Sequence, residues 1–86
     1  MRKYINTIMQ ARLVRTVDTC LTTGDLDYPG TAIEVRDNEG EELFHVVVDS
    51  TGERQVLFFP VGASYRLPLD VLERVLSSAK EKVRHE

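Results

Sequence analysis

The chain has 86 residues and a formal net charge of −3, with 42% hydrophobic and 29% charged residues. This length predicts one domain over residues 1–86, and the composition excludes a disordered chain. No apolar run approaches the roughly 20 residues that a membrane-spanning helix needs, so no membrane partner is expected. Residues 1–6 lack the apolar stretch of a secretory signal and Cys20 is the single cysteine. The sequence therefore predicts a cytoplasmic protein without disulfides.

The first 23 residues fit two interpretations. Ile5 and Ile8 recur at helical spacing, whereas residues 12–22 are rich in valine and threonine. We therefore expect a short helix over 2–11, followed by a strand over 12–22. The apolar stripe also continues beyond the first segment, so one helix over residues 2–23 stays an alternative.

Three short runs further along the chain predict a meander of antiparallel strands, at residues 31–36, 42–48 and 54–59. Residues that favour tight turns, at 37–40 and 49–52, separate them. In the first run apolar and polar residues alternate, which is typical of a strand with one buried face. The second and third runs have apolar residues at both odd and even positions, so we expect both faces of these two strands to be buried by other segments.

The clearest element is an amphipathic helix over residues 68–84, where leucines and valines recur every three or four residues. Pro68 suits its first turn, acidic residues follow at its start, and basic residues lie near its end. The predicted fold is therefore α+β: an antiparallel meander of three to four strands packed by this C-terminal helix, with a short N-terminal helix. One helix cannot cover two faces, so the missing cover is expected from the N-terminal segment or from a second chain, as in a homodimer.

Charge is segregated along the chain. Residues 1–15 carry +4, residues 16–53 carry −9, and residues 54–86 carry +2. An acidic centre repels nucleic acid and favours a basic protein partner, although carboxylates that merely solvate turns and strand faces would give the same pattern. The candidate partner-binding residues are the carboxylates of the predicted strands and turns, namely Glu34, Asp37, Glu39, Glu41, Glu42 and Asp49.

No pattern typical of a catalytic, cofactor-binding or metal-binding site is present. His45 lies inside a predicted strand, where a partly buried, hydrogen-bonded histidine is the ordinary interpretation. Nothing in the spacing of Cys20, His45 and Asp49 places them together as a thiol site. Asp25 and Asp27 resemble the start of a calcium loop, but the glycine and glutamate that such a loop requires are absent. We therefore expect no catalytic residue, cofactor or metal.

These observations favour a small non-enzymatic protein–protein interaction module with an acidic surface. A concrete form is an inhibitor or immunity-type protein that presents carboxylates to the cationic site of a basic partner. One alternative is a structural homodimer. Another is a small enzyme or enzyme subunit with a pocket between the sheet and the 60–66 loop, using His45, Tyr65 and Arg66.

Overall fold

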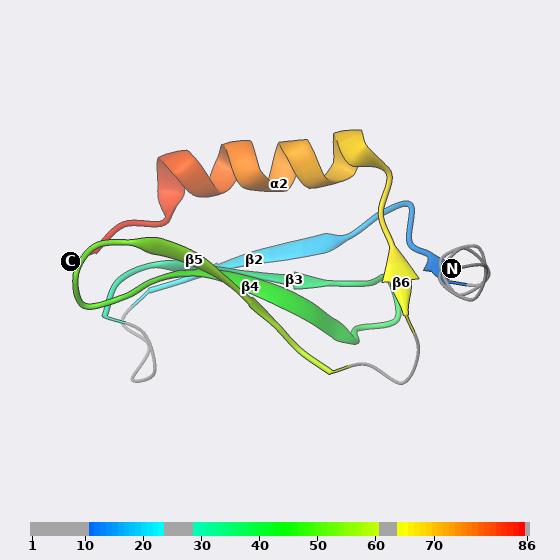
Figure 1. Cartoon of the computed structure of the whole chain (residues 1–86), viewed down its shortest axis with the longest axis horizontal. Helices are drawn as coiled ribbons and strands as arrows, with labels where there is room; N and C mark the ends of the chain where they lie inside the picture. Colours follow the sequence, from blue (N-terminus) through cyan, green and yellow to red (C-terminus); the bar gives the residue numbers. More distant parts are fainter. Residues whose placement is uncertain (1–10, 24–28, 61–63, 86) are drawn as a thin grey trace, which may run out of the picture.

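The four strands of the sheet follow one another in the order of the chain. The computed structural model describes residues 11–23, 29–60 and 64–85, and these form a four-stranded antiparallel sheet with a helix against one face (Figure 1). The strands, in both spatial and chain order, are β2 (Asp18–Thr22), β3 (Ala32–Arg36), β4 (Glu42–Val48) and β5 (Arg54–Phe58). The predicted α+β meander is confirmed.

An aspartate and a glycine shape each of the two hairpin turns. The Oδ1 atoms of Asp37 and Asp49 each accept hydrogen bonds from the amides two and four residues later, at 2.9 to 3.0 Å. Gly40 and Gly52 have φ angles of 91° and 89°, a region that L side chains rarely adopt. The local chemistry of each turn thus sets the antiparallel register of the strands on either side.

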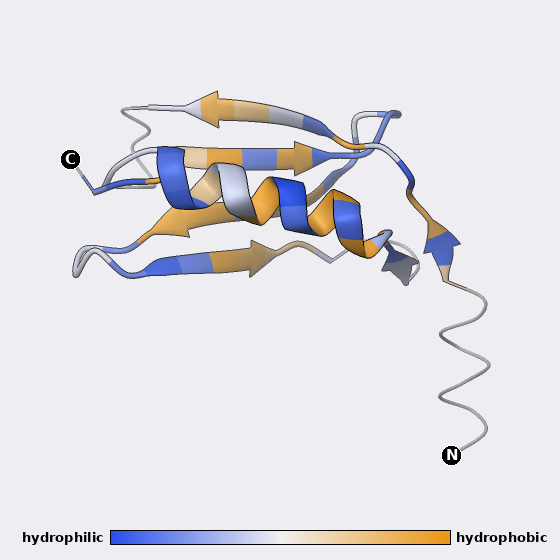
Figure 2. Cartoon of the chain, turned by 90° about the horizontal axis from the view of Figure 1, so that it is seen from above, coloured by the Kyte–Doolittle hydropathy of each residue, from blue (hydrophilic) through white to orange (hydrophobic). Residues whose placement is uncertain are grey.

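The helix α2 (Leu69–Lys82) packs on the sheet through one narrow stripe, at Val71, Val75 and Ala79. Viewed from above, it lies over the two middle strands, and β2 and β5 form the two margins (Figure 2). Val75 and Ala79 of this stripe belong to the hydrophobic core together with side chains of β3 and β4, among them Ile33, Val35, Phe44, Val46 and Val48 at alternate positions. No helix in the described part of the chain is long and apolar enough to cross a membrane.

The strand expected in residues 12–22 forms in two pieces. β1 (Arg12–Leu13) pairs in parallel with β6 (Tyr65–Arg66), outside the main sheet. β2 is an edge strand of the main sheet. The alternative of a single helix over residues 2–23 is wrong for this stretch. The helix expected over residues 2–11 falls on residues that lie outside the described part, apart from residue 11.

The expectation that β4 and β5 are both covered on two faces is correct only for β4. Six of the seven β4 residues are buried, whereas all five β5 residues are exposed. β4 has a strand on each side and α2 above it, but β5 is the last strand and lies beyond the helix (Figure 2). Place in the sheet, more than side-chain type, therefore decides how deeply each strand is buried.

Candidate interaction surface

Among the described residues, β5 has a neighbouring strand on one side only, so its other edge offers backbone groups to solvent. The Phe59 amide donates to the Leu43 carbonyl, and the Asp49 amide donates to the Glu53 carbonyl. Odd-numbered residues of β5 therefore direct their backbone groups at β4. Because the direction alternates along a strand, Arg54, Val56 and Phe58 direct their amides and carbonyls away from the sheet.

The side chains of these same three residues rise from the face that carries α2. Val56 is opposite Val46 and Phe58 is opposite Phe44, with the two phenylalanine ring centroids 5.9 Å apart. Phe58 is nevertheless 69% exposed and Val56 is 39% exposed. Large apolar side chains on an unpaired strand edge mark a surface suited to association.

An apolar groove runs between β5 and α2, and we call it the β5 groove. It consists of two adjoining hollows that share Val56 and Leu76 in their walls. The larger has a volume of about 780 Å³ and the smaller about 360 Å³. The larger hollow is lined by Phe44, Val56, Phe58, Ser64, Tyr65, Leu67, Leu72 and Leu76.

Arg54 fixes one end of the β5 groove. Its Nε donates to the Val83 carbonyl at 2.9 Å and its Nη2 to the Lys80 carbonyl at 3.0 Å. The last carbonyls of a helix carry partial negative charge, so a guanidinium is well placed there. The smaller hollow, which Arg54 and Lys80 border, thus combines apolar walls with a cationic rim.

Asp37 and Asp49, two of the six predicted partner-binding residues, have their carboxylates engaged in the turns. Asp37 is 1% exposed, and its Oδ2 lies 3.0 Å from Nη1 of Arg12. Burial raises the pKa of Asp37, but two turn amides and the Arg12 guanidinium outweigh it and hold this pKa below the usual value. For Asp49, the Thr51 hydroxyl and the turn amides lower the pKa more than burial raises it.

The other four carboxylates are exposed to different degrees. The Glu39 side chain is 75% exposed, and those of Glu41 and Glu42 are 45% and 41% exposed. Glu34 is covered more, at 15%. Glu39 and Glu41 each approach Arg12, at 4.0 and 3.0 Å, so part of the acidic charge is neutralised within the chain.

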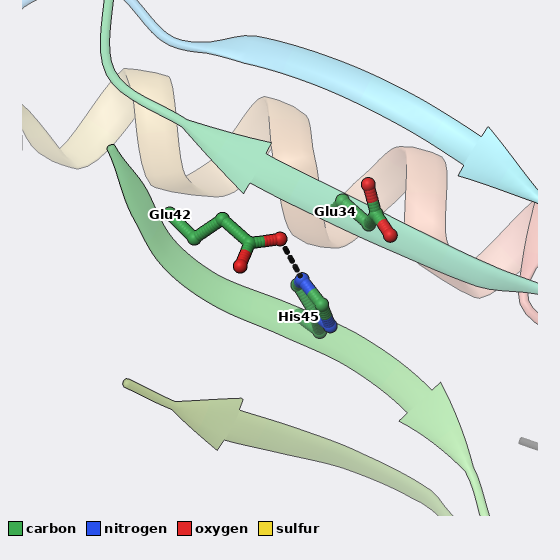
Figure 3. A group of neighbouring side chains, drawn as sticks. All are labelled: Glu34, Glu42 and His45. Atoms are coloured by element: carbon green, nitrogen blue, oxygen red, sulfur yellow. Dashed lines mark hydrogen bonds and ion pairs between the residues drawn. The ribbon is translucent and has the colours of Figure 1, made fainter. Parts of the chain in front are cut away.

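Glu34, Glu42 and His45 form a polar cluster on the sheet face that is turned away from α2 (Figure 3). His45 Nε2 lies 3.1 Å from Glu42 Oε1, and the imidazole packs edge-on against Phe59 with ring centroids 4.5 Å apart. Arg36 Nη2 lies 2.7 Å from Glu34 Oε1 and 3.5 Å from Glu42 Oε1. The alternation predicted for residues 31–36 puts Glu34 and Arg36 on the polar face of that strand, and this is confirmed. The cluster adds two polar residues, Glu42 and His45, from the neighbouring strand β4.

The three side chains of this cluster could in principle offer oxygen and nitrogen ligands to a cation, since their ligand atoms lie within 4.8 Å of one another. The guanidinium of Arg36 already contacts both carboxylates, however, and a cation would have to displace it or lie beside a like charge. The arrangement is therefore that of an ion-pair network, and it does not favour metal binding.

The residues weighed for an enzyme pocket do not share a described cavity. His45 belongs to the face away from α2, whereas Tyr65 lines the β5 groove and donates its hydroxyl to the Leu43 carbonyl at 3.3 Å. Burial raises the pKa of Tyr65, so its hydroxyl stays protonated at neutral pH. Arg66 Nε is bonded to the Ala11 carbonyl at 3.3 Å.

Sequence reasoning missed the β5 groove because its walls come from distant segments. Leu72 and Leu76 belong to the helical stripe, and Tyr65 and Leu67 lie in the connection before it. Apolar side chains at all these positions were equally consistent with a closed core. The one available signal was that the strand at residues 54–59 follows the others in a meander, which leaves it at the margin of the sheet.

Comparison with protein-family models, with curated proteins and with solved structures finds no match for this chain.

Proposed function

We propose that this chain is a small non-enzymatic protein–protein interaction module that binds a protein along β5 and the β5 groove. The observation that carries the proposal is the combination of outward-facing backbone groups and exposed apolar side chains on one strand, next to an apolar groove. A strand added to this edge would gain main-chain hydrogen bonds, while the groove would receive its side chains.

The exposed carboxylates of Glu39, Glu41 and Glu42 form a charged margin that favours basic partners. An inhibitor or immunity-type protein for a basic partner is the concrete form of this proposal. The exposed free thiol of Cys20 fits a reducing cytoplasm.

A photo-crosslinker tests the docking surface. We would replace Phe58 with p-benzoylphenylalanine and irradiate the protein in a cell extract. A matched control carries the same probe at Leu21, an apolar residue of the opposite margin that is 48% exposed. We expect a discrete adduct from position 58 and none from position 21. The adduct should also disappear in the Val56→Pro background, because proline removes an outward N–H from the docking edge.

A probe at position 58 that gives no adduct, or the same adducts from both positions, would overturn the proposal.

The charged margin is tested by the Glu39→Lys/Glu41→Lys/Glu42→Lys variant. Against a basic partner it should bind with a slower association rate and with less dependence on salt. An unchanged association rate would remove the role of the carboxylates and leave the docking surface in place.

A further inference from the structure

We infer that the occupant of the β5 edge is a second copy of this chain, paired antiparallel through β5 about a two-fold axis at Val56. This inference rests on the proposed function, since it names a second copy as the occupant of the β5 edge. The exposed carboxylates of Glu39, Glu41 and Glu42 belong neither to β5 nor to the walls of its groove, so they stay available to a basic partner. It joins two sheets into one of eight strands, with both copies of α2 on the same side.

The backbone of β5 matches itself in this register. Three residues, Arg54, Val56 and Phe58, direct their amides and carbonyls outward, and Val56 is the middle one. In an antiparallel pair centred there, Val56 faces Val56 of the copy and Arg54 faces Phe58 of the copy. Every outward amide and carbonyl of the three residues then has a partner. Such an interface is isologous and closes at two copies.

The end of the strand defines the length of this pairing. Pro60 stands at the next outward position, where it has no N–H to donate. The pairing therefore stops after Phe58 and does not continue along the chain. A proline at this point also disfavours longer, unregulated edge-to-edge aggregation.

The charges along β5 permit a copy to approach. Residues 55–59 carry no charge, so the middle of the pair brings no like charges together. The one charged residue of the strand, Arg54, meets the aromatic ring of Phe58 from the copy. A guanidinium beside an aromatic ring is an attractive cation–π pair. The hydrogen bonds of Arg54 hold its guanidinium at the end of α2, on the sheet face from which the Phe58 side chain of the copy would also rise.

The smaller hollow of the β5 groove lies beside the position where the Phe58 ring of the copy would stand. Its walls include Arg54, Val56, Leu76 and Lys80, and its volume is about 360 Å³. A cavity of about 150 Å³ is enough to hold a benzene ring. The 69% exposed Phe58 of each copy thus has an apolar recess with a cationic rim to enter on the other.

A pairing through one short strand edge is expected to be weak. A standard interface buries about 800 Å² on each partner, which is about one eighth of the 6181 Å² surface of this chain. The outward backbone of β5 comes from three residues, Arg54, Val56 and Phe58, so the strand pairing itself is short. We therefore expect a concentration-dependent dimer with a Kd in the micromolar range.

Sedimentation equilibrium of the purified full chain, from about 1 to about 500 µM, tests the inference directly. We expect a monomer–dimer equilibrium with no larger species. Val56→Pro should raise the Kd about 100-fold, and Phe58→Ala should raise it about 30-fold.

Thr19→Pro is the matched control. Thr19 lies on β2, the strand at the other edge of the sheet. The register of β2, β3 and β4 shows that its backbone groups point away from the sheet and that its side chain lies on the α2 face. This variant should therefore dimerise as the wild type does. Circular dichroism must show that both proline variants remain folded. If Val56→Pro unfolds, the Phe58→Ala result decides, because that side chain lies on the surface.

The outcomes separate this inference from the proposed function. The chain could stay monomeric up to the highest concentration while the probe at position 58 gives a specific adduct with another protein. That result would overturn the inferred dimer and support the proposed docking surface. A dimer that Val56→Pro and Phe58→Ala leave intact also overturns the inference, because its interface then lies elsewhere. A monomer without any specific adduct overturns both.

Discussion

β4 and β5 are neighbouring strands with nearly the same apolar character, but one is buried and the other is exposed. β4 is buried along six of its seven residues, and β5 is exposed along all five. The side chains of β4 therefore stabilise the folded chain, while those of β5 remain available to a partner. An apolar run in a sequence shows which side chains gain from burial. In an edge strand, however, those side chains can be buried by a binding partner instead of by the chain itself.

The largest expected effect comes from removing a β4 side chain. Phe44 is 1% exposed and packs in the hydrophobic core. Phe44→Ala should lower the free energy of unfolding by about 3 to 5 kcal/mol, because it leaves a cavity under α2. Urea unfolding monitored by circular dichroism measures this loss. A loss as small as that of a surface substitution would contradict the assigned role of β4.

A smaller effect is expected at the turn that enters β4. The lowered pKa of Asp37 means that the folded chain holds this carboxylate ionised more strongly than the unfolded chain does. Its contribution to stability is present above the unfolded pKa and is lost as pH falls through the folded value, so the protein should become less stable in acid. Asp37→Asn should flatten this dependence when unfolding is followed between pH 7 and pH 2.

Arg12→Gln is the companion to that experiment. It removes the guanidinium that faces Asp37 but keeps the turn amides, so it should flatten the acid dependence only in part. A pH dependence that is the same in the wild type and in both variants would show that this carboxylate does not contribute to stability.

The turn between β4 and β5 should tolerate change less well than β5 itself. Gly52 has a φ of 89° and open space around it, so Gly52→Ala meets backbone strain and no clash. We expect a loss of about 1 to 2 kcal/mol in the free energy of unfolding. Ser50→Ala, in the same turn but without this backbone requirement, is the control and should change stability by less than about 0.5 kcal/mol. Equal stability of the two variants would disprove the requirement.

The smallest effect on folding is expected at Phe58. At low protein concentration Phe58→Ala should change the free energy of unfolding by no more than about 0.5 kcal/mol, because the side chain is 69% exposed. Comparison with Phe44→Ala sharpens the contrast, since the two rings are in contact across the strands. A loss at Phe58 similar to that at Phe44 would mean that β5 belongs to the core.

The sequence was sufficient for the elements whose signals are local. The Asp and Gly residues of the two turns, the alternation in β3 and the stripe of α2 each act over a few residues, and each was predicted. The pairing of β1 with β6 was not predicted, because two-residue strands more than 50 residues apart leave no periodic pattern.

The candidate surface was predictable only in part. Segregated charge pointed to the carboxylates, yet the structure places Arg12 against Asp37 and Glu41, and Arg36 against Glu34 and Glu42. These contacts depend on how the turns and strands come together. The apolar groove likewise depends on where α2 crosses the sheet, which the stripe on the helix does not specify.

Hydrogen exchange of individual β5 amides tests the central claim most directly. The outward amides of Val56 and Phe58 should exchange quickly in dilute protein and become protected as concentration rises, while Thr19 and Leu21 on the other margin stay unchanged. Leu57, whose backbone faces β4, should be protected throughout. Amides of Val56 and Phe58 that exchange equally fast at every concentration, with or without a partner present, would contradict the account.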